Sequence, residues 1–281
     1  MKTKLKKFAE NFDGELKKYL DTINVPSDFK KTIEYTPLAG GKRLRPYLIH
    51  LFSQNLKINN SLILPLQLAV EIFHSASLIH DDLPAIDNDN LRRGKPTLHT
   101  VFGEGEALLA GDYLMLHAGN LINSLNISIE RSKKLIKAWN TVVENVVIGE
   151  YLDIRYEKYG KVILNEIHRL KTGALFGFCF SSPFIIKGLL DKAEHYEQVG
   201  NAFGICFQIM DDIKDVTGTY KTLGKTPGKD KKLNKPTILD RLSLSESIKY
   251  SSELFKETIQ KIEYVSVRET LVELKEIIEK S

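Results

Sequence analysis

Apolar side chains recur at steps of three and four residues along most of the chain, which is the spacing of helices that bury one face. One such row near the start comprises Phe8, Phe12, Leu16, Tyr19 and Leu20. A similar row near the end comprises Leu254, Ile259, Ile262, Leu271, Leu274 and Ile278. Short breakers separate the helical stretches at residues 25–27, 40–41, 59–61, 103–105 and 159–160. Regular alternation bounded by hairpin turns is absent, so the sequence predicts an all-α fold.

One segment departs from this pattern. Residues 217–236 are rich in Gly, Lys, Thr and Pro and contain hardly an apolar side chain. Because such a segment cannot bury a face, we expect an exposed loop there. The rest of the chain has no comparable linker and no repeat of fixed period. The sequence therefore predicts a single domain over residues 1–281.

Composition narrows the class of protein. The 281 residues are 42% hydrophobic and 27% charged, which is typical of soluble globular proteins and excludes disordered or collagen-like chains. The two cysteines, Cys179 and Cys206, show no zinc-ligand spacing and fit a reducing compartment. The formal net charge of +4 is too small to indicate a nucleic-acid partner.

No segment has the features of a targeting signal or a membrane span. The N-terminus mixes both charges and lacks the apolar core of a signal peptide. The longest uncharged stretch, residues 172–186, is shorter than the ~18 residues that a spanning helix needs. We therefore expect a cytoplasmic protein without stable membrane insertion.

The first candidate for chemistry is the DDxxD sequence of Asp211, Asp212 and Asp215, within the apolar helical context of residues 203–216. On a helix these carboxylates share an arc of about 100° with Gln208. Three carboxylates at the end of an apolar row are costly unless a positive group meets them. This context favours a functional cluster over the alternative, a solvated acidic helix end.

A second acidic cluster comprises Asp81, Asp82, Asp87 and Asp89. Asp81 and Asp87 would face different ways on an ideal helix. Pro84 lies between them and disturbs the helical hydrogen bonding, so we expect both carboxylates to converge. This second cluster alone would equally fit a surface turn, but two aspartate clusters on two apolar helices are a stronger signal.

If the two clusters face one another, like-charge repulsion calls for a divalent cation. Hard carboxylate oxygens indicate Mg²⁺, which proteins hold with few carboxylates, water and substrate phosphate oxygens. Zinc is disfavoured because no His or Cys residues show its ligand spacing. The expected ligand is therefore phosphorylated or diphosphorylated.

Basic residues beside Gly or Pro supply the counterpart. They lie in the stretches 40–46 (GGKRLRP), 92–94 (RRG) and 168–173 (HRLKTG), with Lys225 and Lys235 in the exposed loop. Any one of them alone is more often a solvated charge than a ligand. Together they indicate two phosphate sites, one bridged by metal and one bound by side chains alone.

These stretches resemble those of bacterial short-chain trans-prenyl diphosphate synthases, the farnesyl and geranylgeranyl diphosphate synthase family. The resemblance rests on the stretches 40–46, 73–99, 171–176 and 207–216 and on the lysines of TLGK and NKPT. It implies an isoprenoid-synthase-type helical bundle around a central cavity. It also implies a prenyltransferase that joins isopentenyl diphosphate to dimethylallyl, geranyl or farnesyl diphosphate, and a homodimer.

The resemblance implies roles for individual residues. Asp81 and Asp87 would bind two Mg²⁺ ions and Asp211 a third, with Asp82, Asp212 and Asp215 supporting them in catalysis. The residues implied to bind the allylic diphosphate are Arg92, Lys171, Thr172, Gln208, Lys225 and Lys235, with Lys171 also catalytic. The residues implied to bind isopentenyl diphosphate without metal are Lys42, Arg45, His74 and Arg93. An ordinary buried histidine remains an alternative for His74.

Several positions differ from the family pattern or bear on product length. Asn88 and Asn90 stand where relatives often have aspartates, and Glu150 stands where Gln is usual. Farnesyl-forming members usually have a bulky aromatic residue at the position of Ala76. Small Ala76 and Ser77 leave room for a longer tail, and Phe73 lies one turn deeper. Geranylgeranyl and farnesyl products both stay open, and Phe73 as plain core packing is an equal alternative.

Three rival interpretations stay open. A class I terpene cyclase uses a similar magnesium-dependent cavity but needs no second phosphate site, which the 40–46 stretch and Arg93 provide. A non-catalytic regulatory subunit would lose aspartates, and this chain retains both sets. A plain helical interaction protein remains if the acidic and basic groups do not converge.

The helix expected at 105–124 is apolar enough for a dimer interface or for core, and loop 217–236 is a candidate lid.

Overall fold

The computed structural model describes residues 2–156, 164–217 and 237–279, and nearly all the regular structure in them is helical. This confirms the all-α prediction. Backbone contacts divide the chain into two compact units, namely residues 1–50 with 59–126, and residues 51–58 with 127–281. They are called the first and second units below. The expectation of one domain over residues 1–281 stays a prediction.

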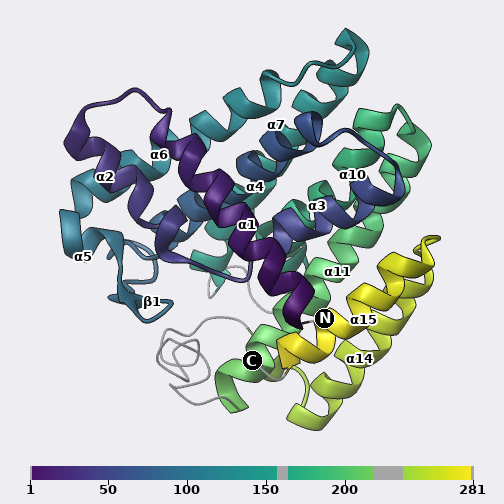
Figure 1. Ribbon diagram of the computed structural model, residues 1–281. Helices are drawn as coiled ribbons and strands as arrows, with labels where there is room; N and C mark the ends of the chain where they lie inside the picture. Colours follow the sequence, from purple (N-terminus) through teal and green to yellow (C-terminus); the bar gives the residue numbers. More distant parts are fainter. Residues whose placement is uncertain (1, 157–163, 218–236, 280–281) are drawn as a thin grey trace. The chain divides into compact units, whose positions relative to one another are not determined.

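The first unit contains six α-helices, a 3₁₀ turn and one hairpin within its described residues. The helices are α1 (Lys2–Asp21), α2 (Ser27–Tyr35), the start of α3 (Leu44–Asn55), α4 (Asn60–Asp81), α5 (Leu98–Phe102) and α6 (Glu104–Asn123), with the 3₁₀ turn η1 at Pro37–Ala39. Helix α4 packs along α6, as Figure 1 shows. The predicted breakers at 25–27, 40–41 and 59–61 all lie at helix boundaries.

Helix α4 is the apolar helix that ends at the first acidic cluster. The Asn59 side chain caps it by accepting a hydrogen bond from the Ser61 amide at 3.0 Å. By length and composition alone α4 could cross a membrane, which no other helix among the described residues could. However, 67% of its most apolar 18-residue window is buried within the protein, as in the core helix of a globular fold.

A short antiparallel hairpin follows the first acidic cluster and was not predicted. Strand β1 (Leu91–Arg92) pairs with β2 (Lys95–Pro96), with Arg92 opposite Lys95. The two turn residues, Arg93 and Gly94, both have positive φ, at 54° and 74°. This is the backbone of a type I′ turn, whose twist matches that of the strands. Two-residue strands are too short to show an alternating pattern in the sequence.

The second unit is built mainly around the long helix α11. Its described elements are the end of α3, α7 (Ile129–Ile154), α9 (Leu164–Ile167), a π-helical turn η3 (His168–Gly173), α10 (Ala174–Lys187), α11 (Leu190–Thr217), the 3₁₀ turn η4 (Ile238–Asp240), α14 (Leu244–Gln260) and α15 (Val265–Glu279). Helices α10 and α11 lie side by side over most of their length (Figure 1).

Close packing and aromatic contacts hold α10 against α11. A Cβ atom added to Gly200 of α11 would lie 2.7 Å from the Gly177 Cα of α10, so only glycine permits this approach. Phe176 contacts Phe203 and Phe207 with ring centroids 5.4 and 5.3 Å apart. Phe184 stacks on Tyr196 at 4.2 Å. Aromatic burial of this kind fixes the position of α11, which carries the second acidic cluster.

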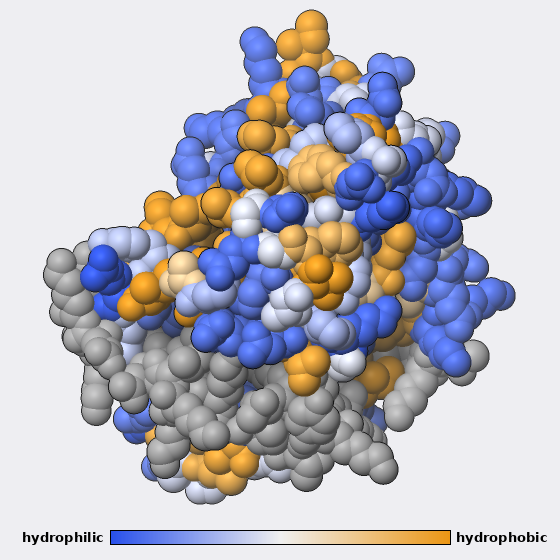
Figure 2. Space-filling view, turned by 90° about the vertical axis from the view of Figure 1, so that its left-hand side faces the viewer, coloured by the Kyte–Doolittle hydropathy of each residue, from blue (hydrophilic) through white to orange (hydrophobic). Residues whose placement is uncertain are grey.

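Apolar side chains remain exposed on two of the helices. On α6, Leu108, Leu109 and Leu116 are 48%, 61% and 75% exposed. On α7, Val147, Ile148, Tyr151 and Ile154 form a second exposed set. Figure 2 also shows apolar groups breaking the hydrophilic surface of the face that it presents. Contiguous exposed apolar groups are typical of interaction surfaces.

Candidate active site

The first acidic cluster forms where α4 ends. The helix stops at Asp81, ahead of Pro84, and the chain folds back on itself. The Asp87 amide donates to the Asp81 carbonyl at 2.9 Å, and the Asp89 amide donates to the Asp82 carbonyl at 3.1 Å. The backbones of Asp81 and Asp87 are therefore adjacent. The chain thus breaks near Pro84 as expected, and the convergence of the two carboxylates stays a prediction.

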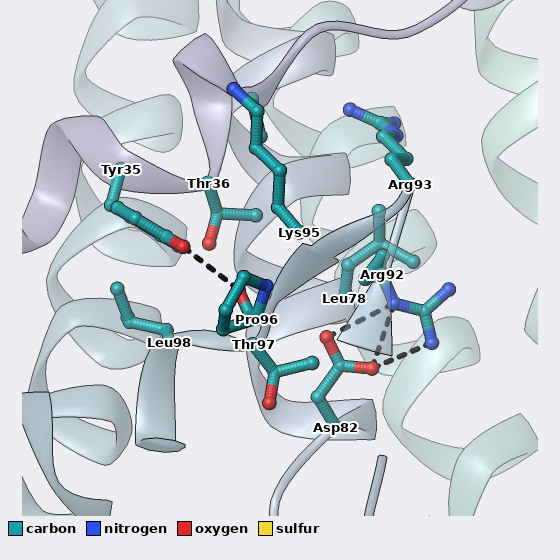
Figure 3. Close-up of a pocket in the computed structure, with 11 residues that line it drawn as sticks. Tyr35, Thr36, Leu78, Asp82, Arg92, Arg93, Lys95, Pro96, Thr97 and Leu98 are labelled. Atoms are coloured by element: carbon teal, nitrogen blue, oxygen red, sulfur yellow. Dashed lines mark hydrogen bonds and ion pairs between the residues drawn. The ribbon is translucent and has the colours of Figure 1, made fainter. Parts of the chain in front are cut away.

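Asp82 is bound to a cation instead of facing solvent. Its carboxylate accepts from Arg92 Nε at 2.7 and 3.0 Å, and Arg92 Nη2 lies 2.6 Å from it (Figure 3). Asp89 lies 3.6 Å from the same Nη2. Burial raises the pKa of Asp82 to about 6, although Arg92 opposes that rise. Arg92, a predicted allylic diphosphate ligand, is thus fixed on the hairpin by Asp82.

Three of the four residues predicted to bind a second diphosphate, Arg45, His74 and Arg93, form a basic cluster in the first unit. Arg45 Nη1 lies 3.3 Å from His74 Nε2. The Arg93 guanidinium lies against Gly41, directly before Lys42, and donates to the Gly40 carbonyl. These contacts connect the 40–46 stretch, α4 and the hairpin, so residues far apart in the sequence lie together. Their binding of a diphosphate stays a prediction.

His74 is neutral in this cluster. Burial lowers the pKa of its imidazole well below the usual value, and Arg45, Arg93, Arg92 and Arg43 lower it further. A neutral imidazole carries no charge, but it can still donate one hydrogen bond and accept another. The crowding of arginines around it creates the positive potential that a polyanion needs.

In the second unit, a π-helical turn presents Lys171 and Thr172. π-helical turns are uncommon and frequently occur at functional sites. Lys171 Nζ lies 2.6 Å from Glu150 Oε2 and 2.5 Å from Asp153 Oδ2, both on α7. One ammonium group therefore lies between two carboxylates. Glu150, which replaces the usual Gln of the family pattern, has a definite partner in Lys171.

The second acidic cluster is linked to this turn by a chain of hydrogen bonds. Thr172 Oγ1 donates to Gln208 Oε1 at 2.8 Å, and Gln208 Nε2 donates to Asp212 Oδ1 at 3.0 Å. The Ile238 amide donates to Asp212 Oδ2 at 3.1 Å. Asp212 is thus a buried anchor, whereas Asp211, the next residue along α11, is exposed. These hydrogen bonds orient the amide of Gln208 and the hydroxyl of Thr172.

His168 gives this part of the site a testable pH dependence. Its side chain is 4% exposed, with Nε2 3.6 Å from Asp212 Oδ2. Burial lowers the pKa of its imidazole to about 4, although a nearby carboxylate, Asp153, opposes the shift. Between pH ~6.5 and 4 the unfolded chain therefore binds the proton more readily than the folded chain, and stability falls as the pH falls.

We expect the His168 imidazole to lower the free energy of unfolding by about 3 kcal/mol between pH 7 and pH 4. The variant His168→Gln should lose less stability over the same pH range. Urea unfolding of wild type and His168→Gln at pH 7 and pH 5 measures the difference. Equal pH slopes for the two proteins would show that the folded chain accommodates the imidazolium.

The structure leaves two predicted ligands undescribed and adds groups that the sequence did not indicate. Lys225, Lys235 and all of the candidate lid 217–236 after Thr217 lie outside the described residues. The added groups are Arg43 with its partners Asp13 and Glu71, the Glu150 contact with Lys171, and the close approach at Gly149. Glu71 is the lone charge in an apolar run, which is the one sequence signal that could have indicated a buried partner.

The donor set fits magnesium. Asp81 and Asp87 offer hard carboxylate oxygens from adjacent backbones, and Asp211 is exposed on α11. Among residues 2–156, 164–217 and 237–279, no three His, Cys, Asp or Glu side chains form a closed metal site. Magnesium does not require one, because water and phosphate oxygens usually complete its six ligands.

The sequence model of the polyprenyl synthetase family matches residues 26–274. The chain belongs to this family. As a member it is a trans-prenyltransferase, an enzyme that elongates prenyl chains. A similar protein is the farnesyl diphosphate synthase of Haemophilus influenzae, which is 35% identical over 99% of this chain and 95% of its own length.

Solved structures of polyprenyl synthetases agree with this membership. The geranyltranstransferase of Thermotoga maritima superposes with a TM-score of 0.84 at 32% identity, over 97% of each chain. The Helicobacter pylori geranyltransferase, solved in complex with magnesium and isoprenyl diphosphate, gives 0.80 at 27% identity over 98% of this chain and 97% of its own. The isoprenoid-synthase type of helical fold predicted from the sequence is therefore confirmed.

Proposed function

We propose that this chain joins isopentenyl diphosphate to an allylic diphosphate to give farnesyl or geranylgeranyl diphosphate. The observation that carries the proposal is the presence in the first unit of two groups of residues suited to two different diphosphates. One is the pair Asp81 and Asp87, whose backbones are adjacent and whose carboxylates would need a bridging cation to bind a diphosphate. The other is a cluster of cations with His74 at its centre. A two-substrate condensation needs both, since both substrates carry a diphosphate.

In this proposal the allylic diphosphate binds through metal. Asp81 and Asp87 would hold two magnesium ions and Asp211 a third. When bound, these ions would supply positive charge opposite the charge that develops on the leaving diphosphate as the allylic C–O bond breaks. The side chains that bind the same diphosphate directly are Arg92, Lys171, Thr172 and Gln208, joined by Lys225 and Lys235.

Isopentenyl diphosphate binds without metal in the basic cluster. Lys42, Arg45 and Arg93 contribute charge, and neutral His74 contributes a hydrogen bond. The double bond of this substrate attacks the allylic carbocation, and the proton then lost passes to the departing diphosphate. No nucleophilic side chain is required, because the enzyme's contribution is positioning, charge and exclusion of water.

Two rivals lack support from the site. A class I terpene cyclase ionises one diphosphate and has no use for a second basic cluster. A non-catalytic subunit has no need of intact carboxylates in both acidic clusters. We further propose a cytoplasmic homodimer, supported by the exposed leucines at positions 108, 109 and 116 of α6, the helix that the sequence offered as an interface.

One assay tests the reaction. The protein is incubated with Mg²⁺, isopentenyl diphosphate and, in turn, dimethylallyl, geranyl or farnesyl diphosphate, and the product chain is identified by mass. We expect elongated diphosphates that vanish when EDTA removes the metal. Hydrocarbon products formed without isopentenyl diphosphate would instead indicate a cyclase, and no turnover with any starter would refute the proposal.

Product length can be tested on α4. Ala76 and Phe73 are both fully buried, five and eight residues before Asp81 on α4. If the growing tail follows this wall, Phe73→Ala is expected to lengthen the product and Ala76→Phe to shorten it. Gas chromatography of the dephosphorylated products measures both, with melting temperatures as the folding control. Unchanged product distributions in two folded variants would leave Phe73 as plain core packing.

Replacing Glu150 is expected to improve substrate binding, whereas most substitutions in the site are expected to weaken it. Its carboxylate competes with the allylic diphosphate for Lys171. Removing that charge in Glu150→Gln is therefore expected to lower KM for geranyl diphosphate by about threefold. Glu144→Gln, at an exposed position of the same helix, is the matched control and should leave KM unchanged. A raised KM in Glu150→Gln would mean that Glu150 orients Lys171 instead of competing for it.

A further inference from the structure

The turn that carries Lys42 has an unusual backbone. Gly40 and Gly41 have φ values of 90° and 142°, which glycine adopts readily. Arg43 also lies in the left-handed region, with φ of 50°. A side chain other than glycine persists in that region only where its surroundings hold it there. Arg43 is therefore constrained by contacts elsewhere in the unit.

Those contacts come from three separate elements. Arg43 Nε donates to Asp13 Oδ1 of α1 at 2.7 Å, and Nη1 donates to Glu71 Oε1 of α4 at 2.6 Å. Nη2 donates to the Pro37 carbonyl of η1 at 2.7 Å. All three guanidinium nitrogens are thus engaged, in the fork geometry that arginine provides and lysine does not.

The hydrogen bonds of the Arg43 guanidinium go to Asp13, Glu71 and the Pro37 carbonyl, and none of these is a proposed diphosphate ligand. The Arg43 side chain is 0% exposed, and Glu71 is 2% exposed. By contrast, Lys42 is exposed and Arg45 is half-buried beside His74. The turn therefore combines a buried anchor, Arg43, with the proposed diphosphate ligands Lys42 and Arg45.

We propose that Arg43 is a positioning residue for isopentenyl diphosphate. Its ion pairs with Asp13 and Glu71 hold the turn in its left-handed form, so that Lys42 and Arg45 reach one diphosphate together with Arg93. The inference rests on the proposed function and deepens it, because it assigns Arg43 no contact with substrate. A one-ångström displacement of binding groups is enough to weaken catalysis strongly.

The test separates position from stability with a single and a double variant. Arg43→Met leaves Glu71 buried without its cation, which destabilises the fold as well as the turn. Adding Glu71→Leu removes that stranded charge and restores stability, since apolar pairs replace buried ion pairs well. The turn still lacks its anchor in the double variant. Arg43→Lys keeps the charge but loses the fork.

We expect Arg43→Met to raise KM for isopentenyl diphosphate about tenfold while KM for geranyl diphosphate stays within about twofold. In the double variant the melting temperature should recover and the raised KM should persist. Arg43→Lys should give an intermediate KM. Leu16→Ala, a fully buried position on α1, is the control for destabilisation alone and should leave both KM values unchanged.

Calorimetry of isopentenyl diphosphate binding without Mg²⁺ provides a readout that does not depend on turnover. Wild type should bind, and the double variant should bind about tenfold more weakly. A KM or affinity that recovers together with the melting temperature would overturn the positioning role, as would an equal effect of Leu16→Ala. If wild type binds this diphosphate but forms no condensation product, the proposed function fails while the role of Arg43 is still decided.

Discussion

Replacing Gly149 by alanine is expected to abolish most of the activity and to destabilise the second unit. A Cβ atom at this position would lie 2.7 Å from the Lys171 Cα and 2.9 Å from the Leu170 carbonyl carbon, and closer still to the Lys171 amide. These are backbone atoms, which no rotamer change can move. Helix α7 and turn η3 must therefore separate.

Separation at Gly149 acts on binding as well as on packing. Overpacking of this kind costs about 1–3 kcal/mol or more. It also moves Lys171 away from Glu150 and Asp153, and Thr172 away from Gln208. Because a misplacement near 1 Å costs about 10²-fold in rate, kcat/KM for the allylic diphosphate should fall by that order.

The matched control is Gly14→Ala on α1, where an added Cβ atom meets nothing within 4 Å. This substitution should raise stability by about 0.5–1 kcal/mol, the usual gain of alanine over glycine inside a helix, and leave kcat/KM unchanged. Urea unfolding and initial rates measure both variants. Wild-type values for Gly149→Ala would show that α7 and η3 do not touch in solution.

Local features of the site followed from the sequence because they depend on nearby residues. Pro84 disturbs helical hydrogen bonding, so a break of the helix between Asp81 and Asp87 could be predicted. The arc shared by Gln208 and Asp212 is a property of helix geometry, and their hydrogen bond agrees with it. Propensity and spacing suffice for such pairs.

Contacts between distant residues could not be predicted in this way. Arg43 and Glu71 lie far apart in the sequence, and the residues around each of them do not indicate the other as its partner. The same holds for Glu150 and Lys171, since only the packing of α7 against η3 brings them together. The hairpin at Arg92 was missed because two-residue strands carry no periodicity, and its signal, Gly94 after Arg93, is a turn feature.

Exchanging Asp81 and Asp211 for asparagine, singly and together, should give the largest losses of rate. Asparagine keeps the size of each side chain but removes the charge that a magnesium ion requires. Each single variant should lose about 10²–10³-fold in kcat/KM, the usual effect of removing one group that stabilises developing charge. Because Asp211 is exposed and Asp81 is half-buried, melting temperatures should change little.

The double variant decides whether the two acidic clusters act on the same diphosphate. If they do, Asp81→Asn with Asp211→Asn should be scarcely slower than either single variant, because groups that act as a unit are not additive. Independent roles would multiply to about 10⁴–10⁶-fold. Geranyl diphosphate with Mg²⁺ should raise the melting temperature of wild type and of Asp191→Asn, an exposed control at the start of α11, but not of the three site variants. Multiplicative losses, or stabilisation retained by Asp81→Asn, would contradict a shared magnesium–diphosphate site.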